Sequence, residues 1–250
     1  MRRQLVAVFA ALCAAGPILS FASSADAARM GAAAAPPDLV ERGRLLFVEG
    51  CSTCHGLEAE GVEGVAPDLR REGAQAADFY LRTGRMPLDK PGDQPLRSNP
   101  AYGEADLDAL VAYVGSLGGP PIPEVEPERG DLAEGMRLFS LDCAGCHQIV
   151  ARGGVVAGAL APPLTSATAT QIAEAVRIGP YVMPHFDERQ LTDDQLDSVV
   201  RYVLSTQEPD NRGGWGIGNI GPIPEGMVAW FLGGAALVAC AWLIGERREG

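Results

Sequence analysis

Positive charge is scarce in this sequence. Its 250 residues contain 20 lysine and arginine residues against 32 aspartate and glutamate residues, so the formal net charge is −12 at pH 7. An excess of negative charge repels the phosphate backbone of DNA and RNA. The composition therefore argues against nucleic acid as a partner. The acidic groups form either a solvated surface or a face that attracts a basic partner protein.

Cysteine and histidine are also scarce, with six and three residues. Cys13 and Cys240 lie in apolar stretches near the two ends of the chain, and we predict that both are inert apolar residues. The other four cysteines form two Cys-x-x-Cys pairs, and a histidine follows each pair directly, at 51–55 and 143–147. The sequence has therefore no spare cysteines for a disulfide framework if these pairs have a chemical role.

Both Cys-x-x-Cys-His motifs are typical of c-type haem attachment. Two thiols separated by two residues can each form a thioether with one haem, and the adjacent histidine then coordinates the iron. We predict two covalently attached haem c groups, bound by Cys51, Cys54 and His55 and by Cys143, Cys146 and His147. A thioredoxin-like pair expects a βαβ context, which the helical and Gly/Pro-rich flanks do not provide. A zinc site would need ligands that converge from both copies.

A Met-Pro dipeptide follows each motif at an equivalent place, at Met86 and Met183. We predict that these thioethers are the second axial ligands, so that the metal ligands are His55 with Met86 and His147 with Met183. A thioether favours ferrous iron, and an iron with both axial positions filled has no site for a substrate. The pattern therefore favours electron transfer over oxygen or peroxide chemistry. His185, near Met183, is the alternative ligand of the second haem.

Apolar spacing shows the same duplication independently of the haem motifs. Each copy begins with a predicted capping box, at 38–41 and 131–134, and has a glycine in its first helix, Gly43 or Gly135, where helices can cross closely. Each copy ends with an amphipathic helix of i, i+3, i+4, i+7 spacing. The apolar positions of these helices are Leu107, Leu110, Val111 and Val114, and Leu196, Val199, Val200 and Val203.

The loops also carry predictions. Pro67 and Pro162, in the loops after the motifs, are predicted to fix the two histidines, because a ligating imidazole usually donates its free N–H to a carbonyl or carboxylate. The first copy has an extra loop at 88–99, rich in Pro, Asp and Gly. This loop is predicted either to contact a partner or to be simple loop variation.

The sequence predicts an all-α fold, with two tandem cytochrome c-type haem domains followed by one C-terminal transmembrane helix. About 20 uncharged residues match the thickness of a bilayer, and the arginines after them favour a cytoplasmic C-terminus with both haem domains on the extracytoplasmic side of the cell membrane. The predicted segments are a signal peptide or uncleaved anchor at 1–27, an Ala/Pro tether at 28–37, domain 1 at 38–118, a Pro-rich hinge at 119–128, domain 2 at 129–207, an irregular membrane-interface segment at 208–225, the transmembrane helix at 226–245 and a cytoplasmic tail at 246–250.

The chain resembles the dihaem cytochrome c subunit of the actinobacterial-type quinol:cytochrome c oxidoreductase, the cytochrome bcc complex. The resemblance extends from about residue 38 to residue 248. It rests on the two haem motifs, on TGRMP at 83–87 and on GPYVMP at 179–184. Its most specific part is GPIPEGM at 221–227, which leads into the C-terminal span.

This resemblance implies an electron-transfer subunit of quinol–cytochrome-c reductase, a translocase of the respiratory chain. The implied partners are a Rieske iron-sulfur subunit, a cytochrome b subunit and, within a supercomplex, an aa3-type cytochrome c oxidase. The haem of His55 and Met86 would receive electrons from the Rieske subunit, and the haem of His147 and Met183 would pass them to the oxidase.

Other functions remain as alternatives. The chain is either this subunit or a membrane-anchored dihaem cytochrome c that serves another oxidase or dehydrogenase. A dihaem peroxidase would need one open axial position, a soluble carrier of the cytochrome c4 type would lack the span, and the dihaem subunit of a cbb3 oxidase usually has its anchor ahead of the haems. A purely structural role in assembly is the remaining alternative.

Overall fold

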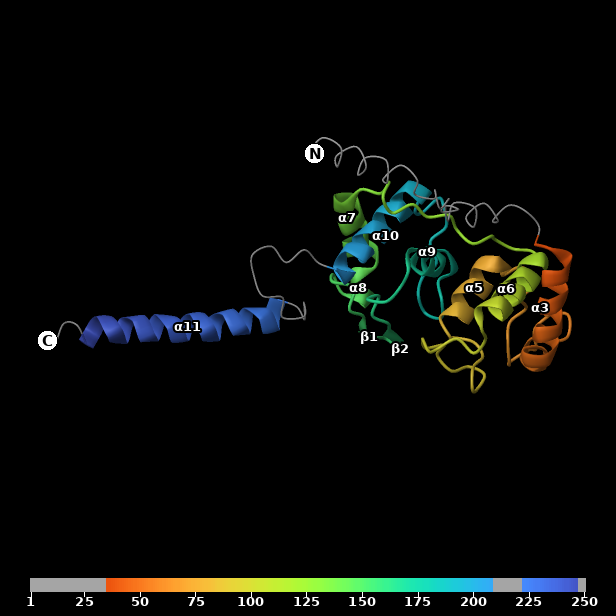
Figure 1. The fold of residues 1–250 in the computed structure, drawn as a ribbon, viewed down its shortest axis with the longest axis horizontal. Coiled ribbons are helices and arrows are strands. Elements are labelled where there is room, and N and C mark those ends of the chain that lie inside the picture. Colours follow the sequence, from red (N-terminus) through yellow and green to blue (C-terminus); the bar gives the residue numbers. More distant parts are fainter. Residues whose placement is uncertain (1–34, 209–221, 247–250) are drawn as a thin grey trace, which may run out of the picture.

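A computed structural model describes residues 35–208 and 222–246, and these residues are mostly helical (Figure 1). The helices are α3 (Pro37–Gly50), α4 (Ser52–His55), α5 (Gly73–Arg82), α6 (Glu104–Ser116), α7 (Leu132–Asp142), α8 (Ala144–His147), α9 (Ala169–Ile178), α10 (Asp193–Gln207) and α11 (Pro222–Glu246). Strands β1 (Gly154–Val156) and β2 (Ala159–Ala161) form one antiparallel hairpin. The all-α prediction is confirmed, and this short hairpin is an addition to it.

Several predicted segments fall on residues that the structure does not describe. They are the leader at 1–27, most of the tether at 28–37, the interface segment from 209 to 221 and the two arginines of the tail, Arg247 and Arg248.

The first and last helices of each domain cross in close contact, α3 on α6 and α7 on α10. At Gly43, an added Cβ would lie 1.9 Å from the carbonyl oxygen of Ala109. At Gly135, it would lie 1.9 Å from the carbonyl oxygen of Ser198. Only glycine allows this approach of two backbones. The close helix crossings predicted at both glycines are therefore confirmed.

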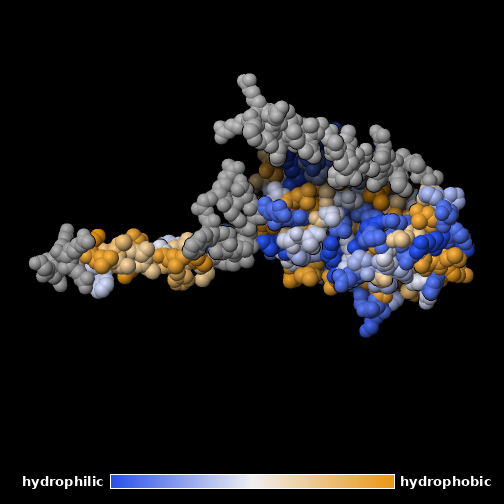
Figure 2. Space-filling view, in the orientation of Figure 1, coloured by the Kyte–Doolittle hydropathy of each residue, from blue (hydrophilic) through white to orange (hydrophobic). Residues whose placement is uncertain are grey.

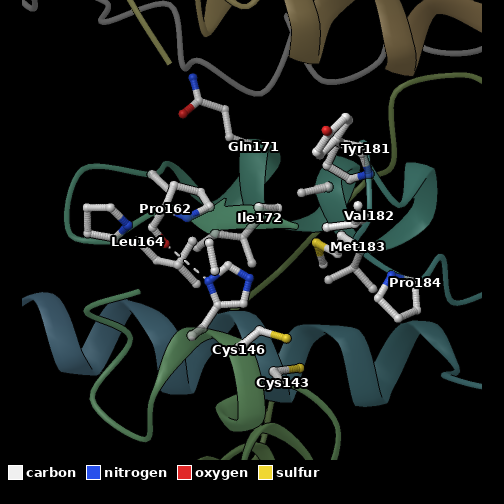
Figure 3. A pocket seen from close by; sticks show the side chains of 18 of the residues that line it. Cys143, Cys146, Pro162, Leu164, Gln171, Ile172, Tyr181, Val182, Met183 and Pro184 are labelled. Atoms are coloured by element: carbon white, nitrogen blue, oxygen red, sulfur yellow. Dashed lines mark hydrogen bonds between the residues drawn. The ribbon is translucent and has the colours of Figure 1, made fainter. Parts of the chain in front are cut away.

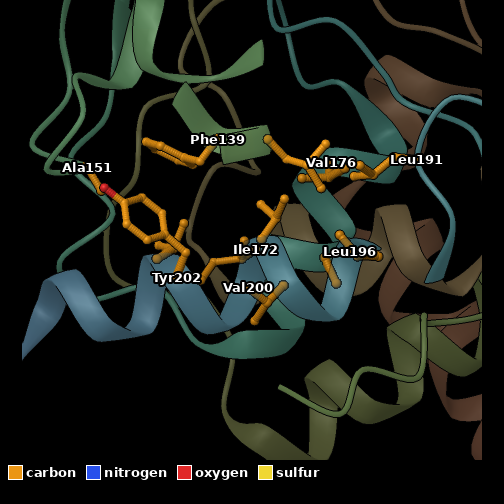
Figure 4. Packing of buried hydrophobic residues seen from close by; sticks show 12 residues of the cluster. Phe139, Ala151, Ile172, Val176, Leu191, Leu196, Val200 and Tyr202 are labelled. Atoms are coloured by element: carbon orange, nitrogen blue, oxygen red, sulfur yellow. The ribbon is translucent and has the colours of Figure 1, made fainter. Parts of the chain in front are cut away.

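Aromatic pairs complete both crossings in the same way. The rings of Phe47 and Tyr113 lie 5.2 Å apart at 51°, and those of Phe139 and Tyr202 lie 5.3 Å apart at 51°. All eight predicted stripe residues of α6 and α10 are buried. Figure 4 shows how Leu196 and Val200 of α10 face the rest of the second core. Tilted aromatic pairs add to the stabilisation from apolar burial.

The predicted capping box at 38–41 is wrong. Helix α3 begins at Pro37, so Asp38 lies within the first turn and caps nothing. Proline competes well for this position because its fixed φ suits a helix and its missing N–H would have no partner there. Asp131 does cap α7 and accepts a hydrogen bond from the N–H of Glu134 at 2.7 Å. The box is incomplete there too, because the Glu134 carboxylate pairs with Arg137.

Helix α11 begins at Pro222, earlier than the predicted start at residue 226. The irregular structure predicted up to residue 225 is therefore wrong for its last four residues. Prolines are compatible with the first turn, where backbone N–H groups have no intrahelical partner. The segment Glu225–Gly245 is long and apolar enough to cross a membrane, and none of its side chains is buried in the rest of the described chain. Figure 2 shows the apolar side chains exposed along this helix.

The two domains contact one another through α5 and α9. Arg82 lies at this contact and pairs with Asp78 at 2.6 Å and with Asp108 at 2.5 Å. Across the contact, Glu174 is fully buried, and neither of its carboxyl oxygens has a hydrogen-bond partner among the described residues. Burial raises the pKa of Glu174 to about 9, and the nearby Asp78 acts in the same direction. Glu174 is therefore protonated at neutral pH.

Replacing Gly43 by alanine should destabilise the first domain. The new Cβ would overlap the backbone of α6, and overpacking of this kind typically costs about 1–3 kcal/mol. Gly103→Ala is the matched control, since its φ is −73° and no atom lies within 4 Å of an added Cβ. Thermal unfolding of the purified full chain, followed by circular dichroism, measures the difference. Equal stability of the two variants would contradict the close crossing.

Glu174→Gln should remove a pH-dependent contribution to stability. Because folding raises the pKa of Glu174, its bound proton stabilises the fold fully below the unfolded pKa, and this contribution is lost as the pH rises toward about 9. The wild type should therefore lose stability relative to the variant between about pH 5 and about pH 9, by at most about 1.4 kcal/mol per pH unit. Denaturant unfolding at several pH values tests this.

The exposed Glu188→Gln variant is the control for that series, because it removes a carboxylate that remains in water. Its stability should stay parallel to that of the wild type across the range. Parallel curves for Glu174→Gln as well would show that Glu174 ionises normally.

Candidate haem-binding sites

A cleft in the second domain gathers the predicted site residues of that domain. Its lining contains Cys143, Cys146, His147 and Met183. In Figure 3, the two cysteines lie at one end of the cleft beside α8, and Met183 approaches from the opposite wall with Val182 and Pro184. Most of the remaining wall is apolar, from Phe139, Ile172 and Val199 among others.

A backbone carbonyl orients His147. Its Nδ1 lies 3.1 Å from the carbonyl oxygen of Pro162 (Figure 3). Because a carbonyl only accepts hydrogen bonds, Nδ1 carries the proton and Nε2 keeps its lone pair. Burial lowers the pKa of His147, which favours the neutral imidazole. This is the form that binds a metal, and the predicted role of Pro162 is confirmed.

The first domain repeats this arrangement. His55 Nδ1 lies 2.9 Å from the carbonyl oxygen of Pro67, so the predicted role of this proline is also confirmed. Burial raises the pKa of the Cys51 thiol to about 11 and that of the Cys143 thiol to about 12. Cys54 is exposed, as is Cys146. Met86 is half-buried, and its N–H donates to a carbonyl of α5 at 3.2 Å.

Sequence reasoning missed the backbone conformation that shapes the loop after each histidine. Ala59 and Ala151 are fully or almost fully buried with φ of 59° and 56°, a region that side chains other than glycine rarely adopt. Close to them, the N–H of Gly61 and that of Gly153 donate to the carbonyls of the two histidines, at 2.8 and 2.9 Å. The signal in the sequence is an alanine at the same distance after both histidines.

The structure separates the two candidate ligands in the 179–186 loop. Met183 packs on the buried core of the second domain and lines the cleft. His185 is exposed, and it is not among the described residues that line the cleft. The backbone of His185 instead packs closely against Gly179, the residue that ends α9 with a φ of 66°.

The first domain supplies part of the wall of the second-domain cleft. Phe79 and Arg85 reach the lining, and so does the loop at 88–99 through Gln94 and Arg97. This loop was predicted to contact a partner or to be loop variation, and it contacts the second domain of the same chain. Its sequence carries no periodic pattern that would have revealed a contact between residues so far apart in the chain.

The set of groups around the cleft fits a covalently attached haem. Two thiols stand beside a neutral imidazole whose Nε2 is free, and a thioether lies across an apolar space. Thiols form the covalent links of haem c, and imidazole and thioether are the usual axial ligands of such an iron. The first domain has the same donors, in Cys51, Cys54, His55 and Met86.

Comparison with known proteins agrees with this chemistry. Residues 40–118 match the family model "Cytochrome c", and residues 130–203 match the model "Cytochrome C oxidase, cbb3-type, subunit III". The chain is 37% identical to the "Cytochrome bc1 complex cytochrome c subunit" of Corynebacterium diphtheriae, over 84% of this chain and 81% of that protein. The protein of that name from Mycobacterium bovis is 38% identical, over 84% of this chain and 78% of that protein.

The chain belongs to the family of cytochrome c subunits of the cytochrome bc1 complex. The family predicted from the motifs is confirmed. The two domains are of the cytochrome c type, and domains of this type imply covalently bound haem c. Similarity to the CcoP subunit of a cbb3-type oxidase from Azospirillum is lower, at 30% identity over 64% of this chain and 60% of that protein. As a member of the bc1 family, the chain takes part in respiratory electron transfer.

Tyr202→Phe should weaken the loop that holds His147. The Tyr202 hydroxyl donates to the carbonyl oxygen of Ile149 at 2.7 Å, and loss of such a bond leaves a carbonyl without its partner at a cost of about 1 kcal/mol. Tyr113→Phe is the matched control, because Tyr113 has the same ring contact and its hydroxyl has no hydrogen bond within the described residues. Denaturant unfolding of both variants measures the difference. A larger loss for Tyr113→Phe would contradict the assignment.

Proposed function

We propose that this bc1-family subunit binds two haem c groups and carries electrons from a Rieske iron-sulfur subunit to an aa3-type cytochrome c oxidase. The observation that supports this most is the duplication of the whole site. Each domain has two thiols, a histidine oriented by a proline carbonyl and a methionine in an equivalent loop. The residues proposed to hold the haems are Cys51, Cys54, His55 and Met86, and Cys143, Cys146, His147 and Met183.

The residues of the chain prepare each site for reversible electron transfer. Hydrogen bonding at Nδ1 leaves Nε2 of His55 and His147 free, so each imidazole would hold a haem together with the methionine of its own domain, Met86 or Met183. Haem, when bound, supplies a one-electron couple at its iron. Because each domain offers both a histidine and a methionine, a bound haem would have no position left for a substrate, which favours electron transfer over peroxide chemistry.

The position of Met183 in the cleft supports it over His185 as the proposed second ligand. Its side chain already lies among the buried residues of the domain, whereas an exposed His185 would have to move into the cleft. The Gly179 contact opposes that movement, because the His185 backbone is packed directly against it.

We further propose that α11 anchors the chain in the cell membrane, with the haem domains outside and the C-terminus in the cytoplasm. The exposed apolar surface of Glu225–Gly245 supports the anchor, and the arginines that follow in the sequence support the orientation. The anchor would keep the domains next to the cytochrome b subunit. The first domain would then face the Rieske subunit, and the second would face the oxidase.

Two ligand exchanges test the function and its direction together. Met86→His and Met183→His each replace a thioether by an imidazole that can still coordinate the iron. Each exchange should lower the reduction potential of one haem, so that its equilibrium constant for reduction falls by more than about tenfold. In affinity-purified complexes, Met86→His should slow quinol-driven reduction of both haems. Met183→His should leave the first haem reducible and slow oxidase turnover. Stopped-flow spectroscopy and oxygen uptake measure these rates.

Met136→His is the matched control, since Met136 is exposed on α7 and should change neither rate. The purified complex should also contain the Rieske, cytochrome b and oxidase subunits. Absence of quinol-driven reduction in the wild-type complex would contradict the proposed function. If Met183→His left the second haem unchanged in spectrum and potential, the proposed ligand would be wrong.

A further inference from the structure

The first domain is fixed onto the mouth of the second-domain cleft by its loop at 88–99. The side-chain amide of Gln94 donates to the Leu160 carbonyl at 2.8 Å and accepts from the Leu160 N–H at 3.1 Å. The Arg97 guanidinium donates to Gln171 Oε1 at 3.1 Å and to the Ser166 carbonyl at 3.3 Å. These bonds attach the loop both to strand β2 and to the beginning of α9.

This contact places two cations in the lining of the cleft. Among the described residues that line the cleft, only Arg85 and Arg97 carry a positive charge. Both belong to the first domain. Neither forms an ion pair with any carboxylate of the described chain. Two cations that line one cleft repel one another, and an anion between them would offset this repulsion.

Arg85 is the more informative of the two because it is only 9% exposed. Its Nη1 donates to the Pro95 carbonyl at 3.0 Å, and its guanidinium lies 5.0 Å from the centre of the Phe79 ring. Its Nε has no hydrogen-bond partner among the described residues. A buried charge with an unused donor is costly, and an anion in the cleft would offset that cost.

We propose that Arg85 and Arg97 of the first domain bind the propionate carboxylates of the haem in the second domain. The inference rests on the proposed function only in that it assigns a haem to this cleft. Guanidinium groups suit carboxylates because they donate several parallel hydrogen bonds to two oxygens. The second haem is then held by both domains, and the extra loop of the first domain has a specific role in binding it.

Arg85 also connects the two sites through the chain, because it directly precedes Met86, the proposed ligand of the first haem. A positive charge at the propionates stabilises the reduced haem, which carries one more electron. Removal of either arginine should therefore lower the midpoint potential of the second haem. The expected change is about tenfold in the reduction equilibrium constant, or about 59 mV for a one-electron couple.

The test is a spectroelectrochemical titration of the detergent-purified holoprotein, which needs neither quinol nor partner subunits. Arg85→Gln and Arg97→Gln should each lower the potential of the second haem, which is recognised as the one altered in Met183→His. Arg85→Lys should recover part of the loss because it keeps the charge. Lys90→Gln is the matched control, since it removes an exposed charge of the same loop that does not line the cleft.

A second readout reports on the propionates themselves. With haem labelled with ¹³C at the propionate carboxyls, the reduced-minus-oxidised infrared spectrum should show a shifted carboxylate band in both arginine-to-glutamine variants and an unshifted band in Lys90→Gln. The proposal is overturned if the labelled band is unchanged, or if the variants and Lys90→Gln shift the potential equally. Either result can be obtained whether or not quinol reduces the complex, so it is distinct from failure of the proposed function.

Discussion

The backbone contact between the first and last helix of each domain is the constraint on which both sites depend. At Gly43 and Gly135 the helices approach so closely that a single added carbon would overlap a carbonyl of the opposite helix. The crossing sets the direction in which α3 and α7 end. Because each Cys-x-x-Cys-His motif begins directly where its helix ends, the crossing also determines where the thiols and the imidazole lie. The histidine loops then need only a carbonyl and a positive-φ alanine to complete the orientation.

The second constraint is the contact between the domains. The charges at this contact are balanced, because Arg82 forms ion pairs with Asp78 and Asp108. Glu174 adds no further negative charge, because burial raises its pKa and it keeps its proton. The loop that carries Gln94 adds hydrogen bonds to the hairpin of the other domain. The two cytochrome c domains therefore form one packed unit, and the wall of the second cleft is complete only with residues of the first domain.

Local patterns made much of this structure predictable. The haem motifs, the apolar stripes of α6 and α10 and the crossing glycines all express short-range periodicity or a single steric requirement, which a sequence displays directly. The prediction at Asp38 failed because two favourable helix starts were adjacent, and Pro37 was preferred over a cap. The C-terminal apolar helix was predicted correctly, but its predicted start at residue 226 was wrong for a related reason. Prolines that discourage a helix interior are well tolerated in the first turn of a helix.

Contacts between distant segments could not be predicted in this way. Nothing in the sequence around Gln94 or Arg97 indicates that they meet the hairpin and α9, because neither lies in a periodic element. The choice between Met183 and His185 likewise depends on how the loop after α9 folds back, which spacing alone does not determine. The function followed from residue types in short motifs, whereas the shape of the cleft followed from tertiary packing.

The most direct test of this account is the number of haem groups attached to each chain. Intact-mass spectrometry of the denatured, purified chain, combined with a pyridine haemochrome assay, measures this number. The account predicts the mass of the polypeptide plus two covalently bound haems, and replacing both cysteines of either motif by alanine should remove one of them. A wild-type chain that carries one haem or none would contradict it.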